Sequence, residues 1–135
     1  MTETKRVLVV DDEESVLFIL NGALARVSDD YQLDVERATD GEEALAKALR
    51  GQYDLLITDI RLPGIDGVEL TEQVRRQSPD TDVIWITAYS CQKLREDAER
   101  LGVYMCLDKP LEIGRIRQAV KAALESSEPR AGQSG

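Results

Sequence analysis

Short strand-like segments alternate with segments of helical periodicity five times along this chain, and no other feature of the sequence constrains its fold so strongly. Four of the segments are uninterrupted apolar runs, as in strands buried on both faces: Val7–Val10, Leu55–Ile57, Val83–Ile86 and Tyr104–Leu107. The fifth, Leu33–Arg37, alternates apolar and charged residues, which predicts an edge strand with one exposed face.

Apolar residues recur at helical spacing after each strand-like segment. The expected core-facing positions are Val16, Leu20, Ala23, Leu24 and Val27; Ala44, Leu45, Ala48 and Leu49; Val68, Leu70, Thr71 and Val74; Leu94, Ala98 and Leu101; and Ile113, Ile116, Val120, Ala123 and Leu124. Alternating strands and helices imply a parallel sheet with helices on both faces. The sequence therefore predicts an α/β fold, a flavodoxin-like doubly wound three-layer sandwich with five helices and strand order 2-1-3-4-5.

The length of the chain, 135 residues, suits one domain. We expect this domain to occupy residues 1–125 and residues 126–135, which have linker-like composition, to form a disordered tail or linker stub. The net charge of −9 disfavours direct binding to nucleic acid or to anionic membranes. The absence of histidine excludes His-based zinc sites and a histidine general base.

The two cysteines, Cys91 and Cys106, form no CxxC motif. So few cysteines indicate no disulfide framework and are typical of a protein in a reducing compartment. The polar N-terminal segment has no signal-peptide pattern, and no apolar run reaches the length of a membrane span. These features predict a soluble cytoplasmic protein.

Polar side chains follow four of the expected strands: Asp11 and Asp12 the first, Asp59 the third, Thr87 the fourth and Lys109 the fifth. A single polar residue commonly follows a strand because strands end at the surface, but ligands of doubly wound sheets also bind at this edge. Three neighbouring carboxylates repel one another, and one lysine compensates only one of them. We therefore expect a Mg²⁺ site here, with Asp59 as a nucleophile toward a phosphoryl group.

Four motifs in this order carry a resemblance to a known family: VLVVDDEE, LLITDIRLPGIDG, ITAYS and LDKP. From about Lys5 to Leu124 the chain resembles a CheY-like response-regulator receiver domain of bacterial two-component signalling. The resemblance implies that Asp59 is the phosphoacceptor and that Asp11 and Asp12 form an acidic pair. It also implies that Asp12, Asp59 and the backbone carbonyl of Arg61 bind Mg²⁺ directly.

The same resemblance assigns the residues that respond when the aspartate is phosphorylated. Thr87 corresponds to the hydroxyl that moves toward the phosphoryl group, Lys109 to the lysine that contacts it, and the Lys109–Pro110 peptide bond to one that is usually cis. Receivers generally carry Tyr or Phe where this chain has Cys106, so the aromatic half of the switch is missing. Two interpretations stay open: Tyr104 substitutes for the ring from the same face of the strand, or Cys106 is only a small apolar filler.

Neighbouring positions carry further expectations. The resemblance implies that Arg61 and Tyr89 line the mouth of the site, where side chains tune the rates of phosphorylation and hydrolysis in the family. We expect Arg61 to attract anionic donors and Tyr89 to hinder water. Leu17 and Phe18 on the first helix would form an apolar patch for docking the donor, although an isolated exposed Phe18 needs no explanation. Trp85 is expected in the core, close enough to Thr87 to report on the site.

The expected function is that of a phosphoacceptor signalling protein, not an enzyme beyond self-catalysed phosphotransfer and autodephosphorylation. Its donor would be a histidine kinase or a histidine phosphotransfer protein, since a chain without histidine can only receive in a His-to-Asp relay. The output would be a changed face formed by the fourth helix, fifth strand and fifth helix, read by an unknown downstream protein. The protein would be a monomer or a phosphorylation-dependent dimer. It would be either a free-standing regulator, which we favour, or the receiver part of a longer regulator with an output domain.

Other classes fit less well. A haloacid-dehalogenase-type phosphohydrolase uses Asp-x-Asp, whereas the first strand is followed here by Asp11-Asp12-Glu13. A receiver-like scaffold that never accepts phosphate would not need the acidic, hydroxyl and lysine positions, all of which are present. Nucleotide-binding motifs of the GxGxxG or GxxxxGK[ST] kind are absent.

Overall fold

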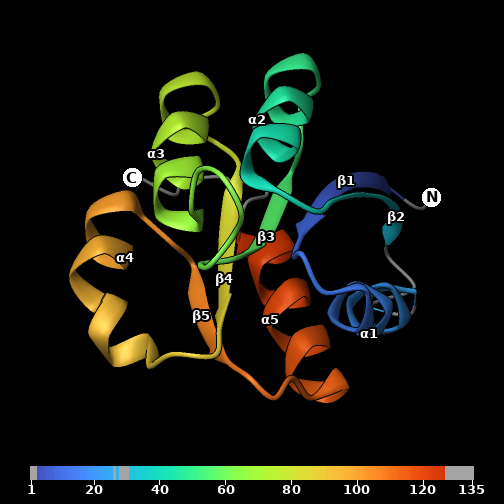
Figure 1. Cartoon of the computed structure of the whole chain (residues 1–135). Coiled ribbons are helices and arrows are strands. Elements are labelled where there is room, and N and C mark those ends of the chain that lie inside the picture. Colours follow the sequence, from blue (N-terminus) through green and yellow to red (C-terminus); the bar gives the residue numbers. More distant parts are fainter. Residues whose placement is uncertain (1–2, 26, 28–30, 127–135) are drawn as a thin grey trace.

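The computed structural model describes residues 3–25, 27 and 31–126. These residues contain one parallel sheet whose strands are β1 (Glu3–Val10), β2 (Tyr31–Ala38), β3 (Leu55–Asp59), β4 (Asp82–Thr87) and β5 (Met105–Asp108). The strands lie side by side in the order β2-β1-β3-β4-β5, with β2 at one edge and β5 at the other (Figure 1). β5 is therefore not buried on both faces as its apolar run predicted, and only Leu107 of this strand is buried. The predicted fold and strand order are confirmed.

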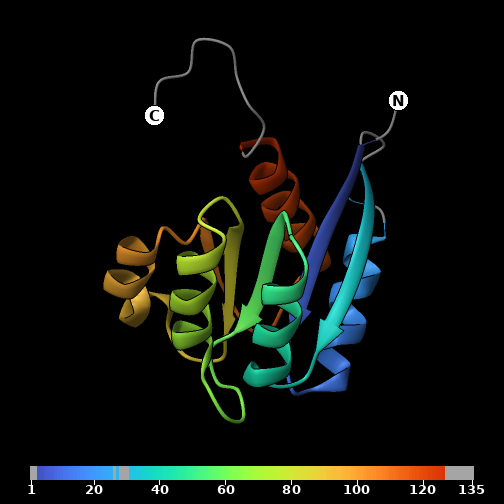
Figure 2. The same ribbon diagram turned by 90° about the horizontal axis from the view of Figure 1, so that it is seen from above.

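Helices cover both faces of the sheet (Figures 1 and 2). They are α1 (Glu14–Leu24), α2 (Gly41–Arg50), α3 (Gly67–Gln77), α4 (Arg95–Leu101) and α5 (Ile113–Ser126), with a short 3₁₀ helix, η1 (Cys91–Leu94), immediately before α4. The helices α1 and α5 pack on one face, and α2, α3 and α4 pack on the other. Among the described residues, no helix combines the length and the apolar character that crossing a bilayer requires.

The central strands divide the apolar residues between two cores. Because side chains alternate along a strand, Val7 and Val9 of β1 join the core under α1 and α5, while Leu8 and Val10 join the core under α2, α3 and α4. All four side chains are fully buried. A strand covered on both faces needs an uninterrupted apolar run, which is why the sequence pattern located these strands.

Side-chain caps define where two of the helices begin. The Asp40 carboxylate accepts a hydrogen bond from the Glu43 amide at 2.7 Å, and the Asp66 carboxylate accepts one from the Glu69 amide at 2.8 Å. Each cap satisfies an amide at the first turn, of α2 and α3 respectively, that has no partner within the helix. The short loop of residues 39–40 after β2 and the longer loop of residues 60–66 after β3 therefore each end at a capping aspartate.

The structure corrects several positions expected from periodicity. Leu17 is fully buried, not part of an exposed patch, because α1 packs against both the sheet and α5 and so buries a wide arc. Leu49 and Ile113 are 52% and 45% exposed, although both were expected to face the core. Each lies in a terminal turn of its helix. The helical spacing of apolar residues therefore extends one turn beyond the part of the helix that packs on the sheet.

Two boundaries also differ. Tyr104 precedes β5 instead of belonging to it and is 38% exposed. Ser126, expected in the tail, is the last residue of α5, and its hydroxyl donates to the Ala123 carbonyl at 2.9 Å. The remainder of the expected tail, residues 127–135, lies outside the described residues.

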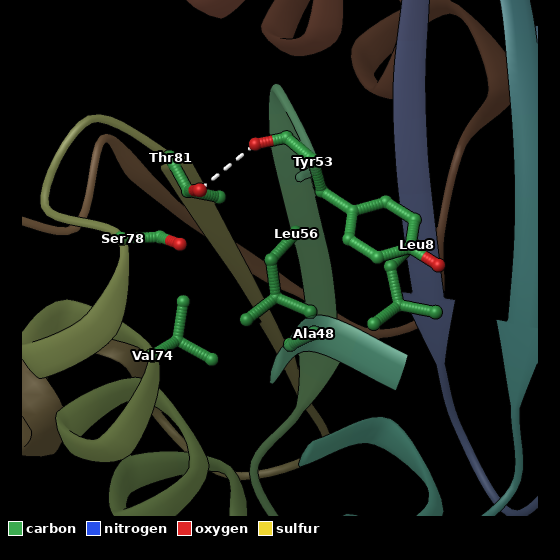
Figure 3. Close-up of a pocket in the computed structure, with 7 residues that line it drawn as sticks. All are labelled: Leu8, Ala48, Tyr53, Leu56, Val74, Ser78 and Thr81. Carbon is green, nitrogen blue, oxygen red and sulfur yellow. Dashed lines mark hydrogen bonds between the residues drawn. The ribbon is translucent and has the colours of Figure 1, made fainter. Parts of the chain in front are cut away.

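A small apolar cavity lies between the sheet, α2 and α3 (Figure 3). Its lining residues are Leu8, Ala48, Tyr53, Leu56, Val74, Ser78 and Thr81. The volume of about 10 Å³ is at the lower limit for a single water molecule. This cavity is a packing gap and not a ligand site.

Candidate functional site

The carboxyl ends of four strands converge at one edge of the sheet. Asp11 directly follows β1, Asp59 is the last residue of β3, Thr87 is the last of β4, and Lys109 directly follows β5. Because β1, β3, β4 and β5 are consecutive neighbours in the sheet, these residues share one edge. This is the edge at which doubly wound sheets bind their ligands.

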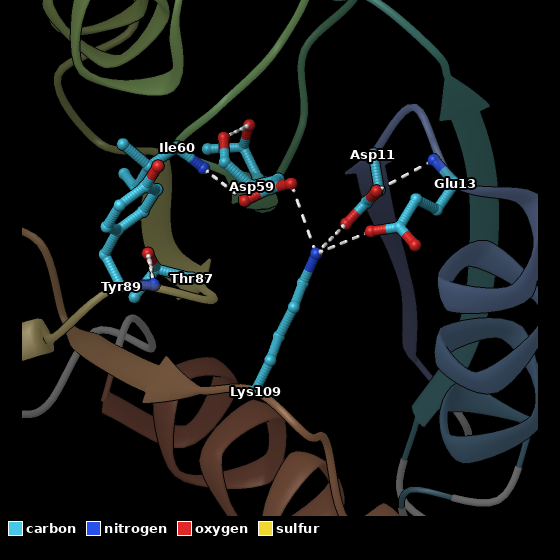
Figure 4. A network of polar contacts seen from close by, with 8 residues as sticks. Asp11, Glu13, Asp59, Ile60, Thr87, Tyr89 and Lys109 are labelled. Carbon is cyan, nitrogen blue, oxygen red and sulfur yellow. Dashed lines mark hydrogen bonds and ion pairs between the residues drawn. The ribbon is translucent and has the colours of Figure 1, made fainter.

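The Lys109 ammonium group lies between the acidic side chains (Figure 4). Its Nζ is 3.0 Å from Asp11 Oδ2, 3.2 Å from Asp59 Oδ2 and 3.5 Å from Glu13 Oε1. Asp11 and Asp59 are buried, whereas Glu13 is exposed. Charge-assisted contacts of this kind are strong when the carboxylates are removed from water.

Backbone amides fix the two buried carboxylates in orientation. The Glu13 amide donates to Asp11 Oδ1 at 2.9 Å, and the Ile60 amide donates to Asp59 Oδ1 at 2.8 Å. In each aspartate, one oxygen therefore accepts a backbone hydrogen bond while the other faces Lys109. Both carboxylates are held in place before any ligand arrives.

Burial and charge act against each other in this network. Burial raises the pKa of Asp11 above its usual range, and this outweighs the hydrogen bonds that it accepts from the Glu13 amide and from Lys109. Burial lowers the pKa of Lys109, but the hydrogen bond and the charge of Asp11, followed by those of Asp59, outweigh it and raise that pKa. Lys109 therefore stays protonated, and the site holds more acidic groups than one ammonium neutralises.

Three consecutive carboxylates form a potential cation site. Oxygens of Asp11, Asp12 and Glu13 all lie within 4.8 Å of one another, with Asp11 buried and the other two exposed. Hard oxygen donors of this kind, open to water on one side, suit Mg²⁺. The sequence pointed to Asp11 and Asp12, but it gave Glu13 no role, because only the fold brings Glu13 next to Lys109.

Thr87, Tyr89 and Arg61 surround the other side of the site. The Thr87 hydroxyl is buried and accepts a hydrogen bond from the Tyr89 amide at 2.9 Å. The Arg61 guanidinium lies over the Tyr89 ring, 4.4 Å from its centroid, as expected for a cation–π contact. This contact joins the segment after β3 to the segment after β4. Figure 4 shows Thr87 and Tyr89 on the opposite side of Asp59 from Asp11. The Lys109–Pro110 peptide bond is cis.

Gly67 places the start of α3 against the end of β3. A Cβ atom at this position would lie 2.3 Å from the Asp59 carbonyl oxygen, so no larger residue fits without a shift of the backbone. The Gly67 amide donates to the Ile60 carbonyl at 2.8 Å. Sequence reasoning missed this residue, although a glycine directly after a helix-capping Asp66 was a signal for it.

Trp85 is connected to the site through α3. Its side chain is fully buried, and its indole Nε1 donates to the Thr71 hydroxyl at 2.9 Å. That hydroxyl donates in turn to the Gly67 carbonyl at 2.7 Å. The core position expected for Trp85 is confirmed, and the chain of contacts reaches the glycine that packs against Asp59.

Cys106 is joined by a disulfide to Cys91, which corrects the expectation that no disulfide forms and the interpretation of Cys106 as a simple filler. Composition could not indicate this pair because η1 turns back alongside β5, and this tertiary contact brings the two residues together. Tyr104 is exposed. Of the expected docking pair, Phe18 is 78% exposed and Leu17 is buried.

Comparison with known proteins agrees with this geometry. The family described as "Response regulator receiver domain" matches residues 7–121. The response regulator protein PilR of Pseudomonas aeruginosa is 34% identical over 127 residues, covering 94% of this chain and 28% of PilR. The sporulation initiation phosphotransferase F of Bacillus subtilis is 30% identical over 120 residues, covering 89% of this chain and 94% of that protein.

Solved structures show the same similarity. A CheY-like response regulator receiver domain protein from Methanospirillum hungatei has a TM-score of 0.83 and 26% sequence identity to this chain, with 93% of this chain and 97% of that chain covered. The chain spans only 28% of PilR and 50% of a second relative, the regulatory protein PhoP of Bacillus subtilis. Its sequence match over residues 7–121, its strand order and its acidic strand ends show that it belongs to the response regulator receiver domain family of two-component signalling.

Proposed function

We propose that Asp59 accepts a phosphoryl group from a phosphohistidine donor in a Mg²⁺-dependent step. The observation that supports this most directly is the position of the Lys109 ammonium, 3.2 Å from Asp59 Oδ2 and 3.0 Å from Asp11 Oδ2. A nucleophilic carboxylate at the end of β3, a fixed cation beside it and a hydroxyl at the end of β4 are the groups that phosphoryl transfer to an aspartate needs.

In the proposed step, an Asp59 oxygen attacks phosphorus while the phosphorus–nitrogen bond of the phosphohistidine breaks. The electron pair of that bond leaves with the imidazole of the donor, and Asp59 becomes an acyl phosphate. Lys109 stabilises negative charge on the phosphoryl oxygens, and the backbone amide of Ile60 keeps the carboxylate oriented. The contribution of the chain is position and charge.

The acidic residues fit a divalent cation. Asp11 and Asp12, with Asp59 and the backbone carbonyl of Arg61, would hold Mg²⁺, and Glu13 lies in the same cluster. When bound, Mg²⁺ supplies charge neutralisation for the phosphoryl oxygens. Asp11 supports this assignment because it is buried beside two other carboxylates, where a bound cation would offset the cost of burying its charge.

The response to phosphorylation starts at Thr87. Its hydroxyl accepts a hydrogen bond from the Tyr89 amide, so movement of the Thr87 side chain toward a phosphoryl group on Asp59 would break this hydrogen bond and free the segment that follows β4. The freed segment continues into η1 and α4, and α4, β5 and α5 form the proposed output face. A histidine kinase or histidine phosphotransfer protein would be the donor and a downstream protein the reader, whether the receiver acts alone or within a longer regulator.

Mass spectrometry of the intact protein tests the proposal. After incubation with acetyl phosphate and Mg²⁺, we expect one added phosphoryl group on the wild type and none on Asp59→Asn. The matched control is Asp80→Asn, at an exposed aspartate beside the amino end of β4 and so away from the carboxyl ends that form the site, which should be phosphorylated like the wild type. An unmodified wild type would refute the proposed function, and an equally modified Asp59→Asn would refute the assignment of the acceptor.

A further inference from the structure

Cys91 and Cys106 are the only cysteines in the sequence, and the structure joins them in a disulfide across 15 residues. Cys91 is the first residue of η1, and Cys106 lies within β5. Their Cα atoms are 5.8 Å apart, within the usual range for a disulfide. Both residues are half-buried, so solutes can reach the pair. Accessible cysteine pairs are those that oxidants and reductants act on readily.

The two cysteines lie next to the segment that follows Thr87 and that we propose is freed when Asp59 is phosphorylated. In the pairing of β4 with β5, Cys106 is opposite Trp85, and Asp108 is opposite Thr87. The Cys91 amide donates to Asp108 Oδ1 at 3.1 Å. The start of η1 is therefore attached to β5 by the disulfide and by one exposed hydrogen bond.

Apart from the disulfide, the start of η1 has few buried contacts, whereas Leu94 and Ala98 further along are partly buried against the core and Arg75 donates to the Leu101 carbonyl at 2.7 Å. Among the described side chains, η1 contributes no buried one, and Leu101 is the one buried side chain of α4. Segments with few buried apolar contacts open locally at low free energy. A covalent bond at Cys91 removes the conformations in which η1 moves away from β5.

We propose that Cys91 and Cys106 form a reversible oxidation site, with a hydroperoxide as oxidant, whose disulfide holds η1 against β5 and opposes the rearrangement that follows phosphorylation of Asp59. The second half of this proposal rests on the proposed function. Oxidation and phosphorylation are then two inputs that act on the same segment, the stretch from Thr87 to Leu94.

The chemistry balances without a metal. One cysteine thiolate attacks an oxygen of the hydroperoxide, the O–O bond breaks, and a sulfenic acid and an alcohol or water form after proton uptake. The second thiol attacks the sulfenic sulfur, the S–O bond breaks, and water leaves with the thiol proton. The two sulfurs lose two electrons in total and the peroxide gains them, and a thiol reductant reverses the process by exchange.

The first experiment examines the site without phosphorylation. The full chain is reduced, treated with hydrogen peroxide and alkylated with N-ethylmaleimide, and its intact mass is measured by mass spectrometry. We expect two alkyl groups on the reduced protein, none on the oxidised protein, and two again after a thiol reductant. Free thiols after peroxide, or disulfide-linked dimers on a non-reducing gel, would overturn the intramolecular site.

Hydrogen exchange then measures whether the bond holds the segment. Amides of residues 89–95 should exchange at least about tenfold more slowly in the oxidised protein than in the reduced one, because local opening is suppressed. The variant Cys91→Ser should show the fast exchange under both conditions. Equal exchange in oxidised and reduced wild type would overturn the proposed constraint whether or not Asp59 is phosphorylated.

Phosphorylation by acetyl phosphate with Mg²⁺ tests the coupling. We expect the oxidised wild type to be phosphorylated at least about fivefold more slowly than the reduced form, the lower end of usual coupling between sites. Cys91→Ser should lose this sensitivity to peroxide. Equal rates in both wild-type forms would overturn the coupling. If neither form is phosphorylated, the proposed function and the coupling fail together, while alkylation and hydrogen exchange still decide the oxidation site.

Discussion

Lys109 donates to both Asp11 and Asp59, at 3.0 and 3.2 Å, so a single ammonium group is shared by carboxylates on two neighbouring strands. The substitution Lys109→Met would leave both buried carboxylates without their cation. We expect it to lower the free energy of unfolding at pH 7 by roughly 3 kcal/mol, the scale observed when one partner of a buried ion pair is removed.

Urea denaturation without Mg²⁺ measures this effect, and Lys93→Met at an exposed lysine is the control. The difference between wild type and Lys109→Met should shrink at acidic pH, where the carboxylates become protonated. Equal unfolding midpoints at pH 7 would show that Lys109 does not compensate the buried carboxylates.

Mg²⁺ affinity should depend on the exposed Asp12. We expect Asp12→Asn to weaken binding by about tenfold or more, equivalent to about 1.4 kcal/mol, because a charged oxygen ligand is lost. The fluorescence of Trp85 reports binding, since its indole is linked through Thr71 to Gly67 beside Asp59. Asp80→Asn should titrate like the wild type. An Asp12→Asn titration that overlays the wild type would remove Asp12 from the metal site.

The contact between Tyr89 and Arg61 should slow hydrolysis of the aspartyl phosphate. Removing the ring in Tyr89→Ala should open the site to water and shorten the lifetime of the phosphorylated protein by roughly fivefold, about 1 kcal/mol in the barrier. The variant Tyr89→Phe keeps the ring and should keep the lifetime. Dephosphorylation followed after removal of acetyl phosphate gives both values, and an unchanged lifetime in Tyr89→Ala would contradict the role of the ring.

Arg61 should affect the forward reaction instead. We expect Arg61→Ala to slow phosphorylation by anionic acetyl phosphate by roughly twofold to fivefold, with a smaller effect at high salt, because an exposed positive charge attracts the donor. A rate that does not change at any salt concentration would contradict this charge effect.

Phe18 should matter only for a protein donor. It is 78% exposed on α1, and the few large side chains that dominate a protein interface each cost more than about 1 kcal/mol of binding when truncated. We expect Phe18→Ala to slow transfer from the phosphorylated histidine protein by about tenfold. Phosphorylation of the same variant by acetyl phosphate should be unchanged. An unaltered transfer rate from the protein donor would exclude Phe18 from docking.

Ionisation of Tyr53 should make the free energy of unfolding depend on pH in the alkaline range. Burial, followed by the hydrogen bond from its hydroxyl to Glu36 at 2.8 Å, raises the pKa of Tyr53 to about 12. The folded protein holds this proton more tightly than the unfolded chain does. The protonated Tyr53 hydroxyl therefore makes its full contribution to the free energy of unfolding below about pH 10, and this contribution is lost as the pH rises from about 10 to about 12. Its size is on the order of 2 kcal/mol.

Urea unfolding at several alkaline pH values isolates this contribution when Tyr53→Phe is compared with the wild type. The variant cannot ionise at this position, so its stability should fall less steeply above about pH 10. Parallel curves for the two proteins would contradict the predicted shift.

Residues that stand next to each other in the chain carried most of the successful predictions. The run Val7–Val10 indicated a strand buried on both faces, and the acidic pair Asp11-Asp12 after it indicated the functional edge. Periodicity was less reliable where a helix has two neighbours or ends, as the buried Leu17 and the exposed Ile113 show.

The alternation of strands and helices and the polar residues that follow the strands are local properties, so apolar periodicity and strand-end residues predicted them. The strand order was predicted instead from the wiring that alternating strand and helix units usually adopt. Three contacts arise only when the elements pack together: Lys109 binds two carboxylates, Gly67 packs against Asp59, and Cys91 is bonded to Cys106. Those contacts depend on how closely elements that are distant in the sequence pack against one another. Neither composition nor spacing along the chain specifies that packing.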